Sequence, residues 1–492
     1  MMNKWIDRRK SALLLHITSL PGPFHKGVLG EEAYRFIDAI LAGGFTVWQF
    51  LPIGPTHSHG SPYESLSTFA GNPELIDLRE CVVAGWLTQE QIQNITTQEA
   101  HKTCLQIAGQ NFWAEVNANP NLKQTIDVFH QTHAYWLDDF ALFTALKSIT
   151  NDQGWWQWDA ALRDRDQDAL QTATSNHAVL IAQVIFEQFI FDRQWHALKS
   201  YAEEKGVQLF GDLPIYVAHD SADVWSHQSL FTVNDDGLCD EVSGVPPDYF
   251  SETGQRWGNP LYRWDNLEQD SFSWWIRRVR RQLELMDMLR IDHFLAFNAY
   301  WAIPGESENG LIGEWRKAPG QALLQTLEDD LGYLPLIAED LGIITEDVTA
   351  LRNHFNLPGM KILQFAFGGD DSNPYLPENH EVNGVVYTGT HDNDTTMGWF
   401  NALDEETTEH ALEVLEAEAS DMPWAMIECA LASPALLCVI PMQDILELET
   451  CARFNTPGTL DDRNWSWRLY EIPATDNICW QRTNTLNIKY QR

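Results

Sequence analysis

The sequence has few basic residues. Its 492 residues include 32 Lys and Arg against 70 Asp and Glu, so the formal net charge is 32 − 70 = −38. Nucleic acids and anionic membranes bind basic surfaces, so neither is an expected partner. A neutral ligand such as a sugar is compatible with this charge.

Cysteine pairs and long apolar runs are also lacking. The seven cysteines are scattered, and no two stand at metal-ligand spacing. This pattern predicts a reduced, cytoplasmic protein. The apolar run before His16 is shorter than the core of a signal peptide, and no stretch is long enough to span a membrane. No Gly/Ser linker, internal repeat or low-complexity segment divides the chain.

Short apolar runs recur along the chain, and most are followed by segments of helical character. The eight runs are residues 12–17, 45–51, 207–210, 286–291, 334–338, 360–367, 385–387 and 436–440. Runs without polar alternation are typical of parallel strands that helices cover on both faces. Helical segments 31–42, 181–205 and 273–285 fit between them. The pattern predicts an α/β fold, a (β/α)8 TIM barrel over residues 10–492.

The spacing of these runs is uneven. About 150 residues separate the second run from the third and about 75 separate the third from the fourth, which is too long for bare loops. We expect residues 55–205 and 213–280 to form inserted subdomains after strands 2 and 3. Insertions on the carboxyl-terminal side of a barrel form walls and lids around a cleft.

Three acidic residues stand where the fourth, fifth and seventh runs end: Asp292, Glu339 and Asp392. Because the carboxyl ends of barrel strands meet on one face, these side chains are expected to converge. Cleavage of a glycosidic bond needs a nucleophilic carboxylate and a carboxylic acid, and a third carboxylate favours the cationic transition state. The alternative is that each acid caps a helix or pairs with a basic residue.

The neighbours of these acids suggest different protonation states. Arg290 shares a strand face with Asp292 and would keep that carboxylate ionised. Glu339 follows two apolar residues and precedes Asp340, surroundings that would help it to keep a proton. Asp340 and Asp394 are possible ligands of a hard cation, but no regular ligand spacing supports a metal site.

Aromatic residues are abundant, with 21 Trp, 13 Tyr and 23 Phe. Flat rings with a polar tip can stack on a glucose unit. Trp155, Trp156, Trp158 and Trp257 are candidates for such stacking, although most aromatic residues are expected in the core. The Gly- and Pro-rich loops 60–73 and 243–260 are either lids over a substrate or structural turns.

Several long motifs together resemble glycoside hydrolase family 77, the 4-alpha-glucanotransferases or amylomaltases. They are SPYESLSTFAGNP (61–73), WLDDFALF (136–143), GDLPIYVAHDSADVW (211–225), GVPPDYFSETGQRWGNPLY (244–262), LRIDHF (289–294), IAEDLG (337–342), PGMKILQFAF (358–367), YTGTHDNDT (387–395) and NTPGT with NWSWR (455–468). The resemblance extends from about residue 10 to about residue 468. It implies a barrel without a separate carboxyl-terminal β-domain, α-1,4-glucan substrates, and no metal or organic cofactor.

The resemblance also implies roles for individual residues. Asp292 corresponds to the nucleophile, Glu339 to the general acid/base and Asp392 to the transition-state stabiliser. Arg290 and His391 correspond to sugar-binding residues of the −1 subsite. The positions at or beside the donor and acceptor subsites are Tyr63, Asp212, Asp248, Gln255, Trp257 and His293.

The expected reaction is a retaining transfer of a glucan segment to the 4-hydroxyl of a glucan or glucose acceptor. The alternatives are an α-amylase-type hydrolase with the same acids and a non-enzymatic glucan-binding protein. The sequence departs from the family at Leu295 and Ala296, where Arg-Gly is common, and at Phe454, where Met is usual; residues 304–316 match only loosely. We expect a monomer or weak homodimer.

Overall fold

Eight parallel strands form a closed barrel in the computed structural model, which describes residues 6, 8–247, 251–342, 344–459 and 461–492. Around the barrel the order is β1-β12-β11-β10-β9-β6-β3-β2. The strands are β1 (Lys10–Leu14), β2 (Val47–Gln49), β3 (Gln208–Pro214), β6 (Met288–Asp292), β9 (Leu336–Ala338), β10 (Gly359–Ile362), β11 (Gly384–Tyr387) and β12 (Leu437–Pro441). The predicted TIM barrel is confirmed.

Each predicted apolar run contains or overlaps one barrel strand, but the ends differ. β1 begins two residues before the predicted run and ends at Leu14, and β10 ends at Ile362 rather than Phe367. Residues Leu363–Phe365 form a 3-10 turn instead, because the chain leaves the barrel at its rim. Buried apolar side chains occur on both faces of the strands; all five residues of β12 are buried.

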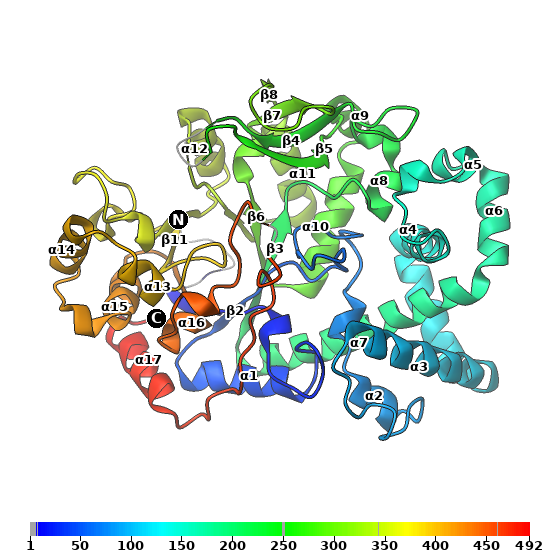
Figure 1. Cartoon of the computed structure of the whole chain (residues 1–492), viewed down its shortest axis with the longest axis horizontal. Coiled ribbons are helices and arrows are strands. Elements are labelled where there is room, and N and C mark those ends of the chain that lie inside the picture. Colours follow the sequence, from blue (N-terminus) through cyan, green and yellow to red (C-terminus); the bar gives the residue numbers. More distant parts are fainter. Residues whose placement is uncertain (1–5, 7, 248–250, 343, 460) are drawn as a thin grey trace.

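Helices cover the outside of the barrel (Figure 1). The three segments predicted to be helical are confirmed as α1 (Glu31–Ala42), α7 (Ala178–Lys205) and α10 (Ser273–Leu285). The others are α2 (Leu78–Val83), α3 (Gln98–Ala118), α4 (Pro120–Ile149), α5 (Ala160–Arg163), α6 (Gln167–Asn176), α8 (Ala222–Ser226), α9 (Trp264–Gln269), α11 (Gly320–Leu331), α12 (Glu346–His354), α13 (Thr396–Asn401), α14 (Glu405–Val414), α15 (Trp424–Ala432), α16 (Met442–Ile445) and α17 (Ile478–Lys489).

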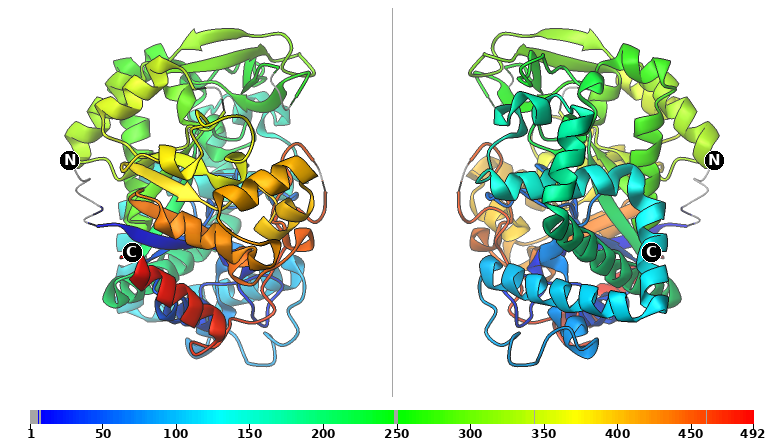
Figure 2. Two further views of the ribbon diagram at one scale, coloured as in Figure 1. Left: turned by 90° about the vertical axis from the view of Figure 1, so that its left-hand side faces the viewer. Right: turned by 90° about the vertical axis from the view of Figure 1, so that its right-hand side faces the viewer.

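Two further layers flank the barrel (Figures 1 and 2). Between β2 and β3, helices α3 and α4 pack against α7. A four-stranded antiparallel sheet has the order β5-β4-β7-β8, with strands β4 (Glu241–Val245), β5 (Gln255–Pro260), β7 (Ala299–Pro304) and β8 (Glu314–Lys317). The sequence did not predict β7 and β8, which follow barrel strand β6. Residues 243–260, predicted as a loop, contain most of the hairpin β4–β5.

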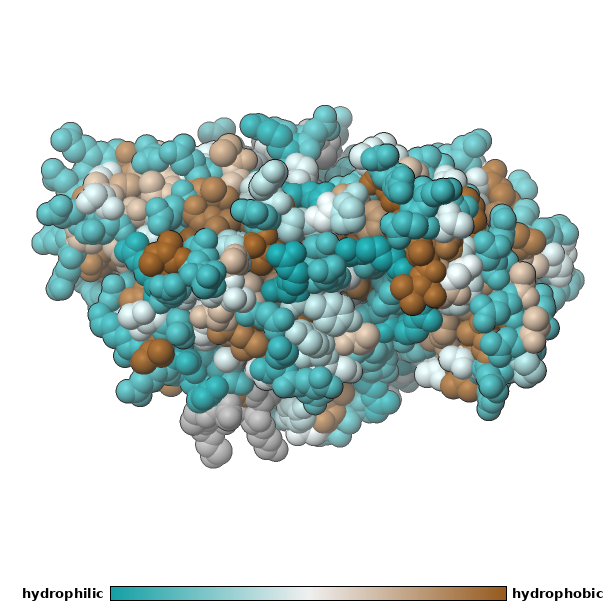
Figure 3. All heavy atoms as spheres, turned by 90° about the horizontal axis from the view of Figure 1, so that it is seen from below, coloured by the Kyte–Doolittle hydropathy of each residue, from teal (hydrophilic) through white to brown (hydrophobic). Residues whose placement is uncertain are grey.

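Hydrophilic side chains dominate the face of the molecule in Figure 3, with only separate hydrophobic spots. This agrees with the excess of acidic over basic residues. Among the described helices, none combines the length and the apolar character that a membrane crossing requires.

Candidate active site

Most of the predicted site residues lie at the carboxyl ends of the barrel strands. Asp212 lies on β3, Arg290 and Asp292 lie on β6, and Glu339 follows β9. Because β3 and β6 are adjacent and parallel, Asp212 stands beside Arg290 in the strand register. The barrel thus gathers side chains that are far apart in the sequence.

Arg290 is buried between two carboxylates. Its Nη1 lies 2.8 Å from Oδ2 of Asp212, and its Nη2 lies 2.8 Å from Oδ1 of Asp292. Burial alone would lower the pKa of Arg290, but the charges of Asp212 and Asp292 hold it well above its usual range. The predicted proximity of Arg290 and Asp292 is confirmed by this ion pair.

Glu339 is surrounded differently. The backbone N–H of His293 donates to its Oε2 at 2.7 Å, and that of Leu341 donates to its Oε1 at 3.1 Å. Burial, reinforced by the negative charge of Asp292, raises the pKa of Glu339 to about 7, although Arg290 acts in the opposite direction. A large fraction of Glu339 is therefore protonated near neutral pH.

Asp340 does not contribute to the environment of Glu339, contrary to the prediction. Its Oδ2 accepts a hydrogen bond from Nη1 of Arg352 at 2.6 Å, and its Oδ1 accepts one from the backbone N–H of Met360 at 2.7 Å. The reason is that successive side chains at the end of a strand point to opposite faces. The like charge next to Glu339 comes instead from Asp292.

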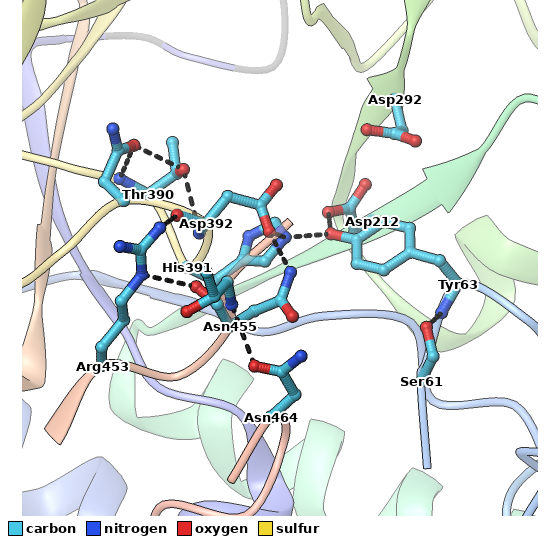
Figure 4. Close-up of polar contacts among 12 residues, drawn as sticks. Ser61, Tyr63, Asp212, Asp292, Thr390, His391, Asp392, Arg453, Asn455 and Asn464 are labelled. Carbon is cyan, nitrogen blue, oxygen red and sulfur yellow. Dashed lines mark hydrogen bonds and ion pairs between the residues drawn. The ribbon is translucent and has the colours of Figure 1, made fainter. Parts of the chain in front are cut away.

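Tyr63 and His391 join the two sides of the site (Figure 4). The Tyr63 hydroxyl donates to Oδ2 of Asp212 at 2.7 Å and lies 2.9 Å from Nε2 of His391. Their rings stack with centroids 5.3 Å apart. Nε2 of His391 is 3.3 Å from Oδ1 of Asp392. Through these contacts and Arg290, a continuous chain of polar interactions runs from Asp292 to Asp392.

The remaining predicted residues lie on the flanking sheet and next to the nucleophile candidate. Trp257 is on β5 rather than in a loop, and its Nε1 donates to Oε1 of Gln255 at 3.1 Å. Its ring meets that of His293 edge-on, with centroids 4.7 Å apart. Burial lowers the pKa of His293 to about 4, so this ring is neutral. Asp248 lies outside the described residues.

Three side chains near the site were not predicted. Arg453, Asn455 and Trp465 come from the segment after β12. Nδ2 of Asn455 donates to Oδ1 of Asp392 at 2.6 Å, and Nη2 of Arg453 donates to the carbonyl oxygen of Asp392 at 2.6 Å. The Trp465 ring lies 5.9 Å from that of Tyr63. The motifs NTPGT and NWSWR in this segment are part of the resemblance to the family, but they did not indicate a role for these residues.

Hollows border the site on two sides. One is lined by His16, His391 and Phe454 among others. The other is lined by Tyr63 and Asp212 among others. Both open next to the chain of polar contacts.

The aromatic cluster of the first long segment belongs mainly to the core. Trp155 has no exposed surface and Trp158 is 5% exposed. Trp156 stacks on His219, with centroids 4.2 Å apart. Trp155 and Trp158 are therefore unsuited to stacking on a sugar.

The described part of the chain contains no group of three His, Cys, Asp or Glu side chains that could hold a metal ion. Asp394, a possible cation ligand by sequence, accepts hydrogen bonds from the Thr395 amide and the Thr450 hydroxyl. Asp340 pairs with Arg352. Both carboxylates thus have protein partners.

The chain is similar to known proteins over nearly its whole length. The model of the family described as 4-alpha-glucanotransferase matches residues 15–473. The 4-alpha-glucanotransferase of Thermus thermophilus is 46% identical over 476 residues, covering 94% of this chain and 95% of the relative. That of Synechocystis sp. is 43% identical and covers 96% of each chain. Among solved structures, an amylomaltase from Streptococcus agalactiae in complex with acarbose has a TM-score of 0.94 at 34% identity, covering 99% of this chain and 100% of that one.

Proposed function

Because the chain belongs to the 4-alpha-glucanotransferase family, we propose that Asp292, Glu339 and Asp392 carry out a retaining transfer between α-1,4-glucans. The enzyme is of the 4-alpha-glucanotransferase class, and its substrates are α-1,4-glucans. The observation that supports these roles best is the pairing of a carboxylate beside Arg290 with a carboxyl group whose pKa is about 7. Double displacement requires one carboxylate that attacks and one carboxylic acid that protonates the leaving oxygen.

In the first half of the reaction, Asp292 attacks the anomeric carbon of the donor. Glu339 gives its proton to the glycosidic oxygen, so that the bond to the leaving chain breaks and a covalent glucanyl-enzyme forms. Asp392 stabilises the positive charge that develops on the sugar ring. In this class of mechanism the two reacting carboxyl groups lie about 5–5.5 Å apart, which we predict for Asp292 and Glu339.

In the second half, Glu339 acts as a base. Its carboxylate takes the proton from the 4-hydroxyl of the acceptor, whose oxygen attacks the anomeric carbon and releases Asp292. A new α-1,4 bond results, with the original configuration retained. Each inversion at the anomeric carbon reverses the other, which is why two displacements retain configuration.

The surrounding residues position the two sugars on either side of the bond. Arg290 and His391 hold the ring in the −1 subsite. The residues at or beside the donor and acceptor subsites are Tyr63, Asp212, Asp248, Gln255, Trp257 and His293. The inserted segments 55–205 and 213–280 act as walls around the cleft. The first of them and residues 244–260 exclude water from the glucanyl-enzyme and bind the acceptor, so that a sugar rather than water completes the reaction.

The protein acts in the cytoplasm as a monomer or weak homodimer, without nucleic-acid or membrane partners. The free state of all seven cysteines supports a reducing compartment. The excess of acidic residues argues against anionic partners.

Incubation with maltotriose separates transfer from hydrolysis. We expect glucose and a ladder of longer chains with little change in total reducing ends, since each bond broken is replaced by another. A steady rise in reducing ends would instead identify a hydrolase.

The Asp292→Ala variant is the matched control for this assay. We expect it to form no ladder, because no glucanyl-enzyme can form without the nucleophile. Undiminished ladder formation by the variant would exclude Asp292 from that role.

A further inference from the structure

Asn455 contacts the carboxylate of Asp392 directly. Its Nδ2 donates to Oδ1 of Asp392 at 2.6 Å, and the residue is only 8% exposed. Figure 4 shows the amide pointing at the carboxylate from the segment that follows β12. The described contacts give the Asn455 side-chain nitrogen no other acceptor.

Arg453, two residues before Asn455, directs its guanidinium to main-chain oxygens. Arg453 donates from Nη2 to the main-chain oxygen of Asp392 at 2.6 Å and from Nε to the carbonyl of Asn455 at 2.7 Å. Asp292 differs, because its carboxylate forms an ion pair with Arg290 at 2.8 Å. Nε2 of His391 lies 3.3 Å from Oδ1 of Asp392, the same oxygen that Asn455 contacts. The side chain of Asp392 thus has an amide donor and an imidazole neighbour, whereas that of Asp292 is paired with a guanidinium.

We propose that Asn455 is a positioning residue that fixes the orientation of the Asp392 carboxylate without neutralising its charge. The inference rests on the proposed role of Asp392 as the stabiliser of a cationic transition state. A guanidinium in the place of Asn455 would offset the negative charge that the transition state needs. A neutral amide orients the same oxygen and leaves its charge available to the sugar.

Residues 454–465 form a loop whose two ends are joined by hydrogen bonds. The backbone N–H of Trp465 donates to the carbonyl of Phe454 at 2.8 Å, and that of Thr456 donates to Oδ1 of Asn464 at 3.0 Å. Asn464 supports this loop, and its side-chain hydrogen bonds go to Thr456 and Thr459 rather than to Asp392. It therefore provides a matched control for removal of an asparagine from the same segment.

The first test compares Asn455→Ala with Asn464→Ala in the maltotriose transfer assay. We expect Asn455→Ala to lower kcat by about 10- to 100-fold with KM within about threefold of wild type, as for a misoriented reacting group. Asn464→Ala should retain kcat within about threefold. Equal losses in both variants would indicate a structural role and overturn the inference.

The second test uses Asn455→Asp, which preserves the shape of the side chain. Above neutral pH its carboxylate would repel that of Asp392, and at lower pH a proton shared by the pair would restore the hydrogen bond. The ratio of kcat for Asn455→Asp to that for wild type should therefore rise as pH falls, whereas the ratio for Asn455→Ala should stay constant. A constant ratio for Asn455→Asp would contradict the inference even if Asn455→Ala fails to fold.

Asp392→Asn distinguishes this inference from the proposed function. If Asp392→Asn retains wild-type activity, the role of Asp392 and everything that depends on it fail. If Asp392→Asn is inactive but Asn455→Ala has the kcat of wild type, only the positioning role of Asn455 is wrong.

Discussion

Opposing influences meet on the carboxyl group of Glu339. Its two backbone hydrogen bonds, from His293 and Leu341, favour the ionised form. Burial and the charge of Asp292 favour the protonated form and bring the pKa to about 7. A pKa near the working pH suits a group that donates a proton in one step and accepts one in the next.

This pKa predicts an alkaline limit to activity. As the pH rises through about 7, Glu339 loses its proton and can no longer protonate the leaving oxygen, so kcat/KM with maltotriose should fall above that pH. The measurement is a pH profile of initial transfer rates.

A glucosyl fluoride donor provides the control, because fluoride leaves without protonation. With this donor the rate of glucanyl-enzyme formation should not fall above pH 7. A parallel fall with both donors would assign the alkaline limit to another group.

At the scale of elements, the regular parts of the barrel could be predicted from the sequence. Apolar runs such as residues 385–387 lie in a parallel sheet covered by helices, so their local composition is enough to predict that they form strands. Strands β7 and β8 lack such a pattern: β8 has the sequence Glu-Trp-Arg-Lys and is mostly exposed. β8 is extended because it pairs with β7, and local composition does not reveal that pairing.

The part of the site that lies on regular barrel strands could be predicted from the sequence. Residues two apart share one face of a strand, which is why Arg290 and Asp292 were expected beside each other on β6. Asn455 comes from an irregular segment after β12, and nothing in its local sequence indicates that it reaches Asp392. For Asp340, the alternation of side chains at a strand end could have shown from the sequence that it points away from Glu339.

Helix α10 is joined to the active-site loops by Arg278. This buried guanidinium donates to the carbonyl of Ile215 at 3.0 Å and to the Thr68 hydroxyl at 2.7 Å, and it also contacts the carbonyl of Pro214 at the end of β3. We expect Arg278→Met to lower the free energy of unfolding by about 3 kcal/mol, because these buried acceptors lose their donor. Urea unfolding measures this change.

Arg280→Met is the control on the same helix. Arg280 is largely exposed and pairs with Asp330 on the surface, so its loss should change the free energy of unfolding by less than about 1 kcal/mol. Equal effects of the two substitutions would mean that Arg278 does not stabilise the junction between α10 and the site.

At the scale of the whole molecule, the charge of −38 affects stability more than substrate binding. Like charges spread over a folded surface repel one another, and this repulsion is relieved when the chain unfolds. An α-1,4-glucan carries no charge, so the field of the protein neither attracts nor repels it over long distances. A change of ionic strength should consequently alter the stability of the protein but not its binding of substrate.

We therefore predict that NaCl stabilises the protein without changing its encounter with substrate. Raising the salt from about 0.01 M to about 0.15 M shortens the screening length from about 30 Å to about 8 Å, which weakens repulsion between distant carboxylates more than attraction within contacting ion pairs. The Tm in differential scanning calorimetry should rise, whereas kcat/KM with maltotriose should change less than about twofold. KCl and choline chloride should have the same effect as NaCl, because screening depends on ionic strength and not on the cation. Stabilisation by one cation alone would instead indicate a specific ion site, and a fall in Tm would mean that the surface ion pairs outweigh the net repulsion.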